Sequence, residues 1–167
     1  PRHLEAGVGT GYFLDTCRFP APPSKLVIID RNAYTTAETA HRLARYRPVA
    51  YCRNLLEPLD IPEAPFDSIG FNYVLHCLPG SIASKAVVFE HLRNVMSPGA
   101  VLFGSTTLCH GVSKNIFARA CMLAYNRLGI FSNLHDSLGD LQTVLAQLFS
   151  ESSVTVAGCS GLFVCRR

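Results

Sequence analysis

Apolar and polar positions alternate along the chain with two different periods, which predicts strands that alternate with helices. The run KLVIID at residues 25–30 is almost continuously apolar and rich in β-branched side chains, as expected for a strand buried on both faces of a parallel sheet. This alternation indicates an α/β fold. Further strands are predicted before residue 7, at 49–52, 66–75 and 100–104, and as a closing pair at 153–157 and 161–165.

Five segments between these strands have the apolar spacing of helices, the first of them at 11–18. Thr35 and Glu38 form a capping-box pattern for a helix that runs to about Tyr46. Ser81 caps a helix that the Ser-Pro-Gly turn at 97–99 should end, and two more helices are predicted at 115–128 and 137–148. The side chains expected to face the core from the second and fourth helices are Ala37, Ala40, Leu43, Ala44, Ile116, Phe117, Ala120, Leu123, Ala124 and Leu128.

The composition is that of a single globular domain. Of the 167 residues, 49% are hydrophobic and 16% are charged, which is enough apolar material for one core over residues 1–167. A net charge of +3 without a basic tract gives no support for a nucleic-acid partner. Because no apolar stretch is long enough to span a membrane and no signal-peptide pattern is present, we expect a soluble cytoplasmic protein.

The seven cysteines are odd in number, form no C-x-x-C pair and lie mostly within apolar runs. We therefore expect buried free thiols in a reducing compartment. Neither these cysteines nor the six histidines have the close spacing of metal ligands, so the sequence predicts no metal site.

The chemistry of the chain is concentrated near its start, in the run EAGVGTG at residues 5–11. Three glycines remove the Cβ where a turn needs unusual dihedral angles and where backbone approaches a ligand closely. A dinucleotide fingerprint that starts at Gly7 would need a glycine where Tyr12 stands, and no Lys-Ser or Lys-Thr pair follows for a phosphate-binding loop. The pattern indicates another kind of nucleotide or nucleoside site, and its alternative is a tight turn without a ligand.

An acidic residue ends the strand predicted at 25–30. Asp30 follows the glycines by about 20 positions, the separation at which a carboxylate accepts hydrogen bonds from a ribose diol. Its negative charge disfavours the 2′-phosphate of NADP. An aspartate between a strand and a helix can equally be a turn or cap residue, so this alternative stays open.

Four features in this order resemble the motifs of class I S-adenosylmethionine-dependent methyltransferases, in particular the type 11/12-like, small-molecule group. They are the acidic residue before G-x-G-x-G, Asp30, the pair Asn54-Leu55, and the run from Phe66 to Pro79. The resemblance implies a Rossmann-like doubly wound seven-stranded sheet, mostly parallel with a C-terminal antiparallel hairpin and with helices on both faces. It also implies that residues 1–167 lack the N-terminal lid helices that relatives usually carry.

The resemblance assigns a set of residues to S-adenosylmethionine. Asn54 stands where the family more often has an aspartate at the adenine amine, and its amide oxygen can still accept from that amine. The backbone N–H of Leu55 would reach the adenine ring. For each polar member the alternative is an ordinary loop or strand-end residue. The implied cofactor residues are Glu5, Gly7, Gly9, Thr10, Gly11, Asp30, Arg31, Asn54, Leu55 and Asn72.

On the acceptor side, a doubly wound sheet places the strand at 66–75 beside the first strand, with its carboxyl end toward the transferable methyl group. We expect Asn72 and Tyr73 to orient the substrate or the methionyl part of the cofactor. His76 is the candidate general base, with a structural histidine as its alternative. His110 is a further candidate for the acceptor pocket, because loops at this point lie over the strand ends in this architecture.

The implied activity is methyl transfer to an oxygen, nitrogen or carbon of a small-molecule acceptor. The Asn/Asp-Pro-Pro-aromatic tetrad of nucleic-acid N-methylation is absent at the strand predicted from residue 66, where Asn72 is followed by Tyr-Val-Leu. Two alternatives stay open, a non-catalytic cofactor-binding or scaffold relative and, with less support, an NAD-dependent Rossmann oxidoreductase. The sequence leaves the oligomeric state undetermined.

Overall fold

Seven strands form one sheet in the order β3-β2-β1-β4-β5-β7-β6 in the computed structural model, which describes all residues from 1 to 167. Strands β1 to β5 pair in parallel, whereas β7 pairs antiparallel with both β5 and β6. The predicted doubly wound sheet with a closing hairpin is therefore confirmed. The strands are β1 (Arg2–Ala6), β2 (Lys25–Asp30), β3 (Val49–Cys52), β4 (Phe66–Asn72), β5 (Met96–Thr107), β6 (Glu151–Ala157) and β7 (Ser160–Arg166).

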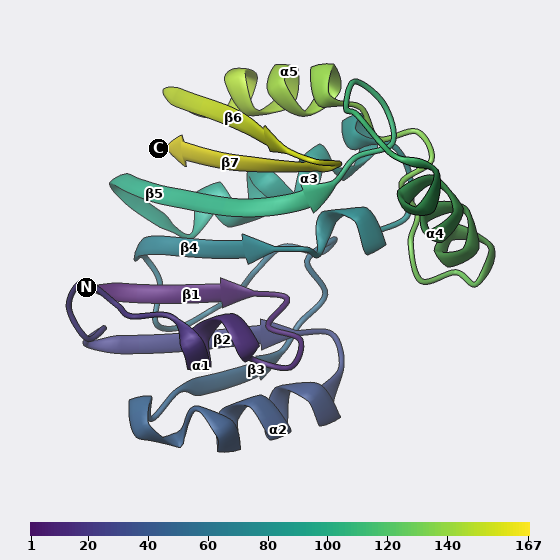
Figure 1. The fold of residues 1–167 in the computed structure, drawn as a ribbon. Coiled ribbons are helices and arrows are strands. Elements are labelled where there is room, and N and C mark those ends of the chain that lie inside the picture. The colour runs from purple at the N-terminus through teal and green to yellow at the C-terminus, as the bar shows by residue number, and fades with distance from the viewer.

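Helices cover both faces of the sheet (Figure 1). Successive strand residues point to opposite faces, so apolar side chains on each face need helices to cover them. Leu26 and Ile28 of β2 pack with Leu14 of the first helix on one face, and the alternate residues of β2 belong to the larger core on the other. The helices are α1 (Tyr12–Thr16), α2 (Ala33–Arg42), α3 (Ile82–Asn94), α4 (Ile116–Arg127) and α5 (Leu138–Leu148), with short 3₁₀ helices η1 (Ala44–Tyr46) and η2 (Leu75–Cys77).

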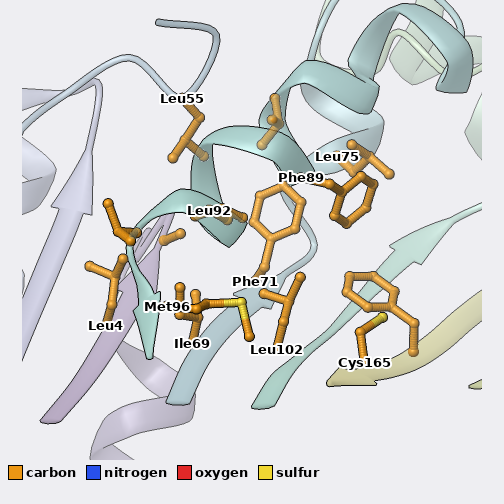
Figure 2. Close-up of a cluster of buried hydrophobic side chains, with 14 of the residues drawn as sticks. Leu4, Leu55, Ile69, Phe71, Leu75, Phe89, Leu92, Met96, Leu102 and Cys165 are labelled. Carbon is orange, nitrogen blue, oxygen red and sulfur yellow. The ribbon is translucent and has the colours of Figure 1, made fainter. Parts of the chain in front are cut away.

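The main core lies between the sheet and the helices α3 and α5. Figure 2 shows the part of it beside α3. At its centre three phenylalanine rings meet edge to face or tilted: Phe71 of β4 lies 5.8 Å from Phe89 of α3, and Phe163 of β7 lies 5.7 Å from Phe89, measured between ring centroids. Such aromatic contacts add to the burial of large apolar area. This core fixes β4 and β5, whose carboxyl ends reach the candidate site.

The start of α2 differs from the sequence prediction. The N-cap is Asn32, whose side-chain oxygen accepts hydrogen bonds from the N–H groups of Tyr34 and Thr35 at 3.0 and 3.2 Å. The Thr35–Glu38 capping box was therefore wrong, because the helix and its N-cap begin three residues earlier. Thr36 and Thr39 are buried together with Leu43 on the inward face of the helix, whereas the predicted Ala37 and Ala44 are exposed.

The end of α3 was also placed too late. The helix ends at Asn94 and β5 begins at Met96, so Pro98 and Gly99 lie inside the strand instead of ending a helix. The register between β4 and β5 shifts between Phe66 and Ser68, an irregularity that accommodates the proline and glycine.

Helix α4 lies beyond the carboxyl ends of β4 and β5, apart from the sheet (Figure 1). Only Met122 is buried in it, whereas Ile116, Phe117, Leu123 and Leu128 are at least half exposed. The predicted inward face of this helix was therefore wrong. Periodicity finds an apolar stripe correctly, but it does not say whether a partner element lies against the stripe.

The expected burial of the cysteines was also wrong. All seven are free, but Cys165 alone is buried, and four of them are exposed. Apolar neighbours in sequence were a poor guide to burial here, because exposed positions of edge strands and of α4 also have apolar neighbours. No helix is both long and apolar enough to cross a membrane.

Candidate functional site

The glycine turn between β1 and α1 has a left-handed backbone at every glycine, with φ of 72° at Gly7, 52° at Gly9 and 71° at Gly11. A Cβ on Gly7 would lie 2.2 Å from a methyl carbon of Val74, and one on Gly11 would lie 2.5 Å from the Thr39 methyl carbon. A Cβ on Gly9 would meet nothing within 4 Å. Gly7 and Gly11 are thus required by packing, whereas Gly9 opens onto free space.

Two cavities adjoin at this turn. The glycine-turn cavity, of about 190 Å³, and the Asp30 cavity, of about 270 Å³, share Gly7, Gly9 and Tyr73 in their walls. Both lie at the carboxyl ends of the parallel strands, where open α/β sheets bind ligands. All ten cofactor residues predicted from the sequence line one or both: Glu5, Gly7, Gly9, Thr10, Gly11 and Asn72 line the first, and Gly7, Gly9, Asp30, Arg31, Asn54 and Leu55 line the second.

Asp30 ends β2 and points toward the glycine turn. Its Oδ2 accepts a hydrogen bond from the Gly9 N–H at 3.1 Å, and its Oδ1 accepts one from the Asn32 N–H at 3.0 Å. A carboxylate has about four acceptor positions, so two remain for hydroxyl groups. The Gly9 carbonyl in turn accepts from Thr39 Oγ1 at 2.7 Å, which ties the turn to α2.

In the loop after β3, the Asn54 side chain is already hydrogen-bonded within the loop, whereas the backbone N–H of Leu55 is free. The Asn54 amide group donates to Glu57 at 2.9 Å and its oxygen accepts from the Leu56 N–H at 3.1 Å, so this side chain mainly shapes the loop. The N–H of Leu55 donates to no acceptor within the chain. This free N–H lies where the resemblance expects a donor to the adenine ring.

Glu5 is buried beside the end of β4. Its carboxylate lies 3.3 Å from His3 Nε2 and 3.5 Å from the Asn72 amide nitrogen, while His3 Nδ1 lies 2.8 Å from the Ser68 hydroxyl. The two neighbours hold the Glu5 carboxylate in place on the wall of the glycine-turn cavity. The sequence analysis missed His3, although its position two residues before Glu5 puts both on the same face of β1.

Tyr73 has a left-handed backbone, with φ of 55°, which is unusual for a bulky residue. Its N–H donates to the Ser105 carbonyl at 2.7 Å, so the strand pairing holds this conformation. The ring stacks on Phe13 with centroids 6.1 Å apart, and both rings stay partly exposed beside the cavities. Strained residues of this kind cluster at ligand sites.

His76 has a geometry that argues against the general base expected from the sequence. Its Nδ1 accepts the N–H of Thr107 at 3.2 Å, which puts the ring proton of the neutral form on Nε2. Burial, with a smaller contribution from the Lys85 charge, lowers the pKa of His76 to about 4. His76 is 4% exposed and its ring packs 4.4 Å from Phe131. The ring is therefore a neutral acceptor that joins η2 to the end of β5 and packs against the loop after α4.

His110 lies away from both cavities. It is exposed, contacts the Leu134 carbonyl through Nε2 at 2.8 Å, and lines a third cavity, the His110 cavity of about 380 Å³, with Lys114 and Arg119. The structure therefore does not bring His110 to the cofactor residues, because the loop after β5 turns toward α5 instead of back over the glycines.

A buried polar network fastens the loop after α4, and sequence reasoning missed it. Lys85 of α3 and Asp136 are both fully buried, with Nζ 2.6 Å from the carboxylate, and Lys85 also donates to the Ser132 carbonyl at 2.7 Å. Burial lowers the pKa of Lys85 and raises that of Asp136, while their contact opposes both shifts. Asn133 adds a bond to the Thr107 carbonyl at 2.9 Å. The sequence does contain one signal for this network, because Lys85 lies within the apolar stripe of a predicted helix and a buried lysine needs a partner.

Comparison with known proteins gives a family. Residues 4–102 match the family model of the methyltransferase domain. The chain is 42% identical to demethylluteothin O-methyltransferase of Streptomyces thioluteus, over 96% of this chain and 70% of that protein. It is 37% identical to methyltransferase ctvB of Aspergillus terreus, over 99% of this chain and 75% of that protein.

A solved structure with the same fold is N-methyltransferase NodS from Bradyrhizobium japonicum in complex with S-adenosylhomocysteine. It aligns with a TM-score of 0.69 at 18% identity, over 99% of this chain and 77% of that one. The sheet order and the glycine turn at the switch point indicate the same family as the sequence matches. The chain belongs to the class I S-adenosylmethionine-dependent methyltransferases.

Proposed function

We propose that this enzyme transfers the methyl group of S-adenosylmethionine to an oxygen of a small molecule, with the cofactor in the two adjoining cavities. The observation that carries the proposal is the convergence of all ten predicted cofactor residues on those cavities. Oxygen is preferred over nitrogen and carbon because the Streptomyces relative, at 42% identity, is an O-methyltransferase.

The residues fit such a cofactor. Gly9 leaves open the space that a Cβ would fill, Asp30 keeps acceptor capacity for a ribose diol, and the Leu55 N–H is free for an adenine nitrogen. Glu5, held by His3 and Asn72, supplies a carboxylate for the ammonium group of the methionyl part. The sulfonium would supply an already activated methyl group, so the protein needs no further electrophile.

The remaining task of the chain is alignment. Tyr73 is the residue shared by both cavities on the side of β4, and with Phe13 it forms an aromatic wall at the cavity mouth. A wall of this kind excludes water and orients an acceptor, and well-oriented reactions gain up to about 7–11 kcal/mol from such placement. We assign no general base, since the ring nitrogen of His76 that lacks a proton already accepts a backbone N–H.

We also propose a cytoplasmic location and no nucleic-acid substrate. The seven unpaired cysteines suit a reducing compartment. The net charge of +3 is small, and strong nucleic-acid binding requires many phosphate contacts from lysine and arginine.

Calorimetry with S-adenosylmethionine, S-adenosylhomocysteine and NADH tests the proposal. We expect both sulfur cofactors to bind and NADH not to bind. Asp30→Ala should weaken S-adenosylmethionine binding by roughly ten- to a hundredfold, as expected for hydrogen bonds to a charged group. The control is Asp60→Ala, which removes an exposed carboxylate that lines neither cavity.

Other outcomes decide between the alternatives. Binding of NADH alone would indicate an oxidoreductase, and binding of none of the three would favour the scaffold reading. An equal effect of Asp30→Ala and Asp60→Ala would remove Asp30 from the cofactor site.

A further inference from the structure

An open space larger than either cofactor cavity lies elsewhere in the molecule. It is a cavity of about 600 Å³ between the loop before α3 and the C-terminal half of α4, here called the α4 cavity. Leu123, Phe131 and Leu134 give it apolar walls, while Arg127 and His135 supply its charged or titratable groups. No acidic residue lines it.

The two basic side chains of this cavity have no partner in the protein. Arg127 and His135 are exposed, and neither side chain forms a hydrogen bond or an ion pair with the chain. The nearest acid in sequence, Asp136, is buried and already paired with Lys85 at 2.6 Å. The adjoining His110 cavity, which shares Leu123 and Leu134, also has no acidic residue in its wall. An unpaired guanidinium at the edge of an apolar cavity favours an anionic ligand.

A row of aromatic rings connects the α4 cavity with the cofactor cavities. The Tyr73 ring, in the wall of both cofactor cavities, lies 5.9 Å from the His76 ring, which lies 4.4 Å from the Phe131 ring of the α4 cavity. The Tyr73 and Phe131 rings, one in the wall of each site, therefore pack against the same His76 ring, which places the two sites next to one another. An acceptor seated in the α4 cavity could present its far end beside Tyr73.

Resting on the proposed function, we propose that the acceptor is an elongated molecule with an apolar body and a carboxylate, which binds Arg127 in the α4 cavity while its hydroxyl group lies near Tyr73. The planar fork of a guanidinium can pair with a carboxylate through two hydrogen bonds, and its single charge balances a carboxylate monoanion but only half of a dianionic phosphate. His135 adds an N–H donor beside it. Arg127 is thus a specificity residue for the acceptor.

The test compares an acid with its neutral amide. Binding of 4-hydroxycinnamate and of 4-hydroxycinnamamide is measured by calorimetry on enzyme saturated with S-adenosylhomocysteine. We expect the acid to bind roughly tenfold more tightly than the amide, and added salt to reduce the difference, since the pair is partly exposed. R127M should abolish the preference and R127K should keep only part of it, because lysine lacks the planar fork.

The matched control is R119M, which removes an exposed arginine from the same helix but from the wall of the other cavity. It should leave the preference for the acid unchanged. Equal affinities for acid and amide, no saturable binding of the acid, or a preference that survives R127M would each overturn the inference. Because S-adenosylhomocysteine binding is measured first, failure of the proposed function appears there and is distinguished from failure of the acceptor site.

Discussion

Replacing Gly9 by alanine separates the role of the glycine turn in folding from its role in cofactor binding. The added Cβ meets no heavy atom within 4 Å, so the only cost to folding is the left-handed backbone at φ of 52°. That cost is about 1–2 kcal/mol for a residue with a side chain. For a domain of this size it lowers the melting temperature by roughly 2–8 °C. We expect a folded protein whose affinity for S-adenosylmethionine falls at least about tenfold, because the methyl group points into the space of the two cavities.

Gly11→Ala is the matched comparison. It has the same left-handed backbone, with φ of 71°, but its Cβ would lie 2.5 Å from the methyl carbon of the buried Thr39. We therefore expect a larger loss of stability than for Gly9→Ala. Thermal melts and calorimetry on both variants decide the matter. A Gly9→Ala protein that binds S-adenosylmethionine as tightly as the parent would show that the cofactor does not approach this turn, and equal melting temperatures of the two variants would refute the packing argument.

Two further predictions concern the buried polar groups around the loop after α4. Because the folded pKa of His76 lies near 4, below its ordinary 6.5, the proton binds the unfolded state more tightly. The stability that His76 contributes is therefore complete above pH 6.5 and is lost as the pH falls toward 4, by up to about 3 kcal/mol. Urea unfolding at pH 7 and pH 4.5 should show a smaller loss for His76→Gln, whose amide can still accept from Thr107, and an unchanged loss would contradict the shift. Asp136→Ala leaves the Lys85 charge buried without its partner, so we expect about 3–5 kcal/mol of destabilisation in urea. The double variant Lys85→Met with Asp136→Leu should be less destabilised than Asp136→Ala, and a single variant within 1 kcal/mol of the parent would be evidence against the pair.

The sheet could be predicted from the sequence because its signals are local. The strands at 25–30 and 49–52 have the predicted bounds, and Ser137 caps α5 through the N–H of Asp140 at 3.0 Å as expected. Errors arose where two residues could cap the same helix, and where an apolar stripe had no partner element. Asn32 was a stronger cap than Thr35, and the apolar stripe of α4 gave no information about whether another element covers it.

Some residues of the candidate site could likewise be predicted from the sequence, and others could not. The glycines, Asp30 and Leu55 could be found because each acts through backbone geometry or a strand end, which spacing in sequence records. His76 and His110 could not be assigned, since the role of an imidazole depends on which atoms meet its two nitrogens.

The network behind the α4 cavity explains why the acceptor side cannot be found by motif. Lys85 and Asp136 are 51 positions apart, and only the fold brings them together. A buried ion pair seldom adds net stability over apolar packing, so its value here is positional. Met122 is the only buried residue of α4, so the loop carrying Phe131 and His135 depends on polar contacts, and this pair and Asn133 supply buried side-chain hydrogen bonds to it. Acceptor specificity can then change through exposed side chains such as Arg127 without any change to the glycine turn or to the core.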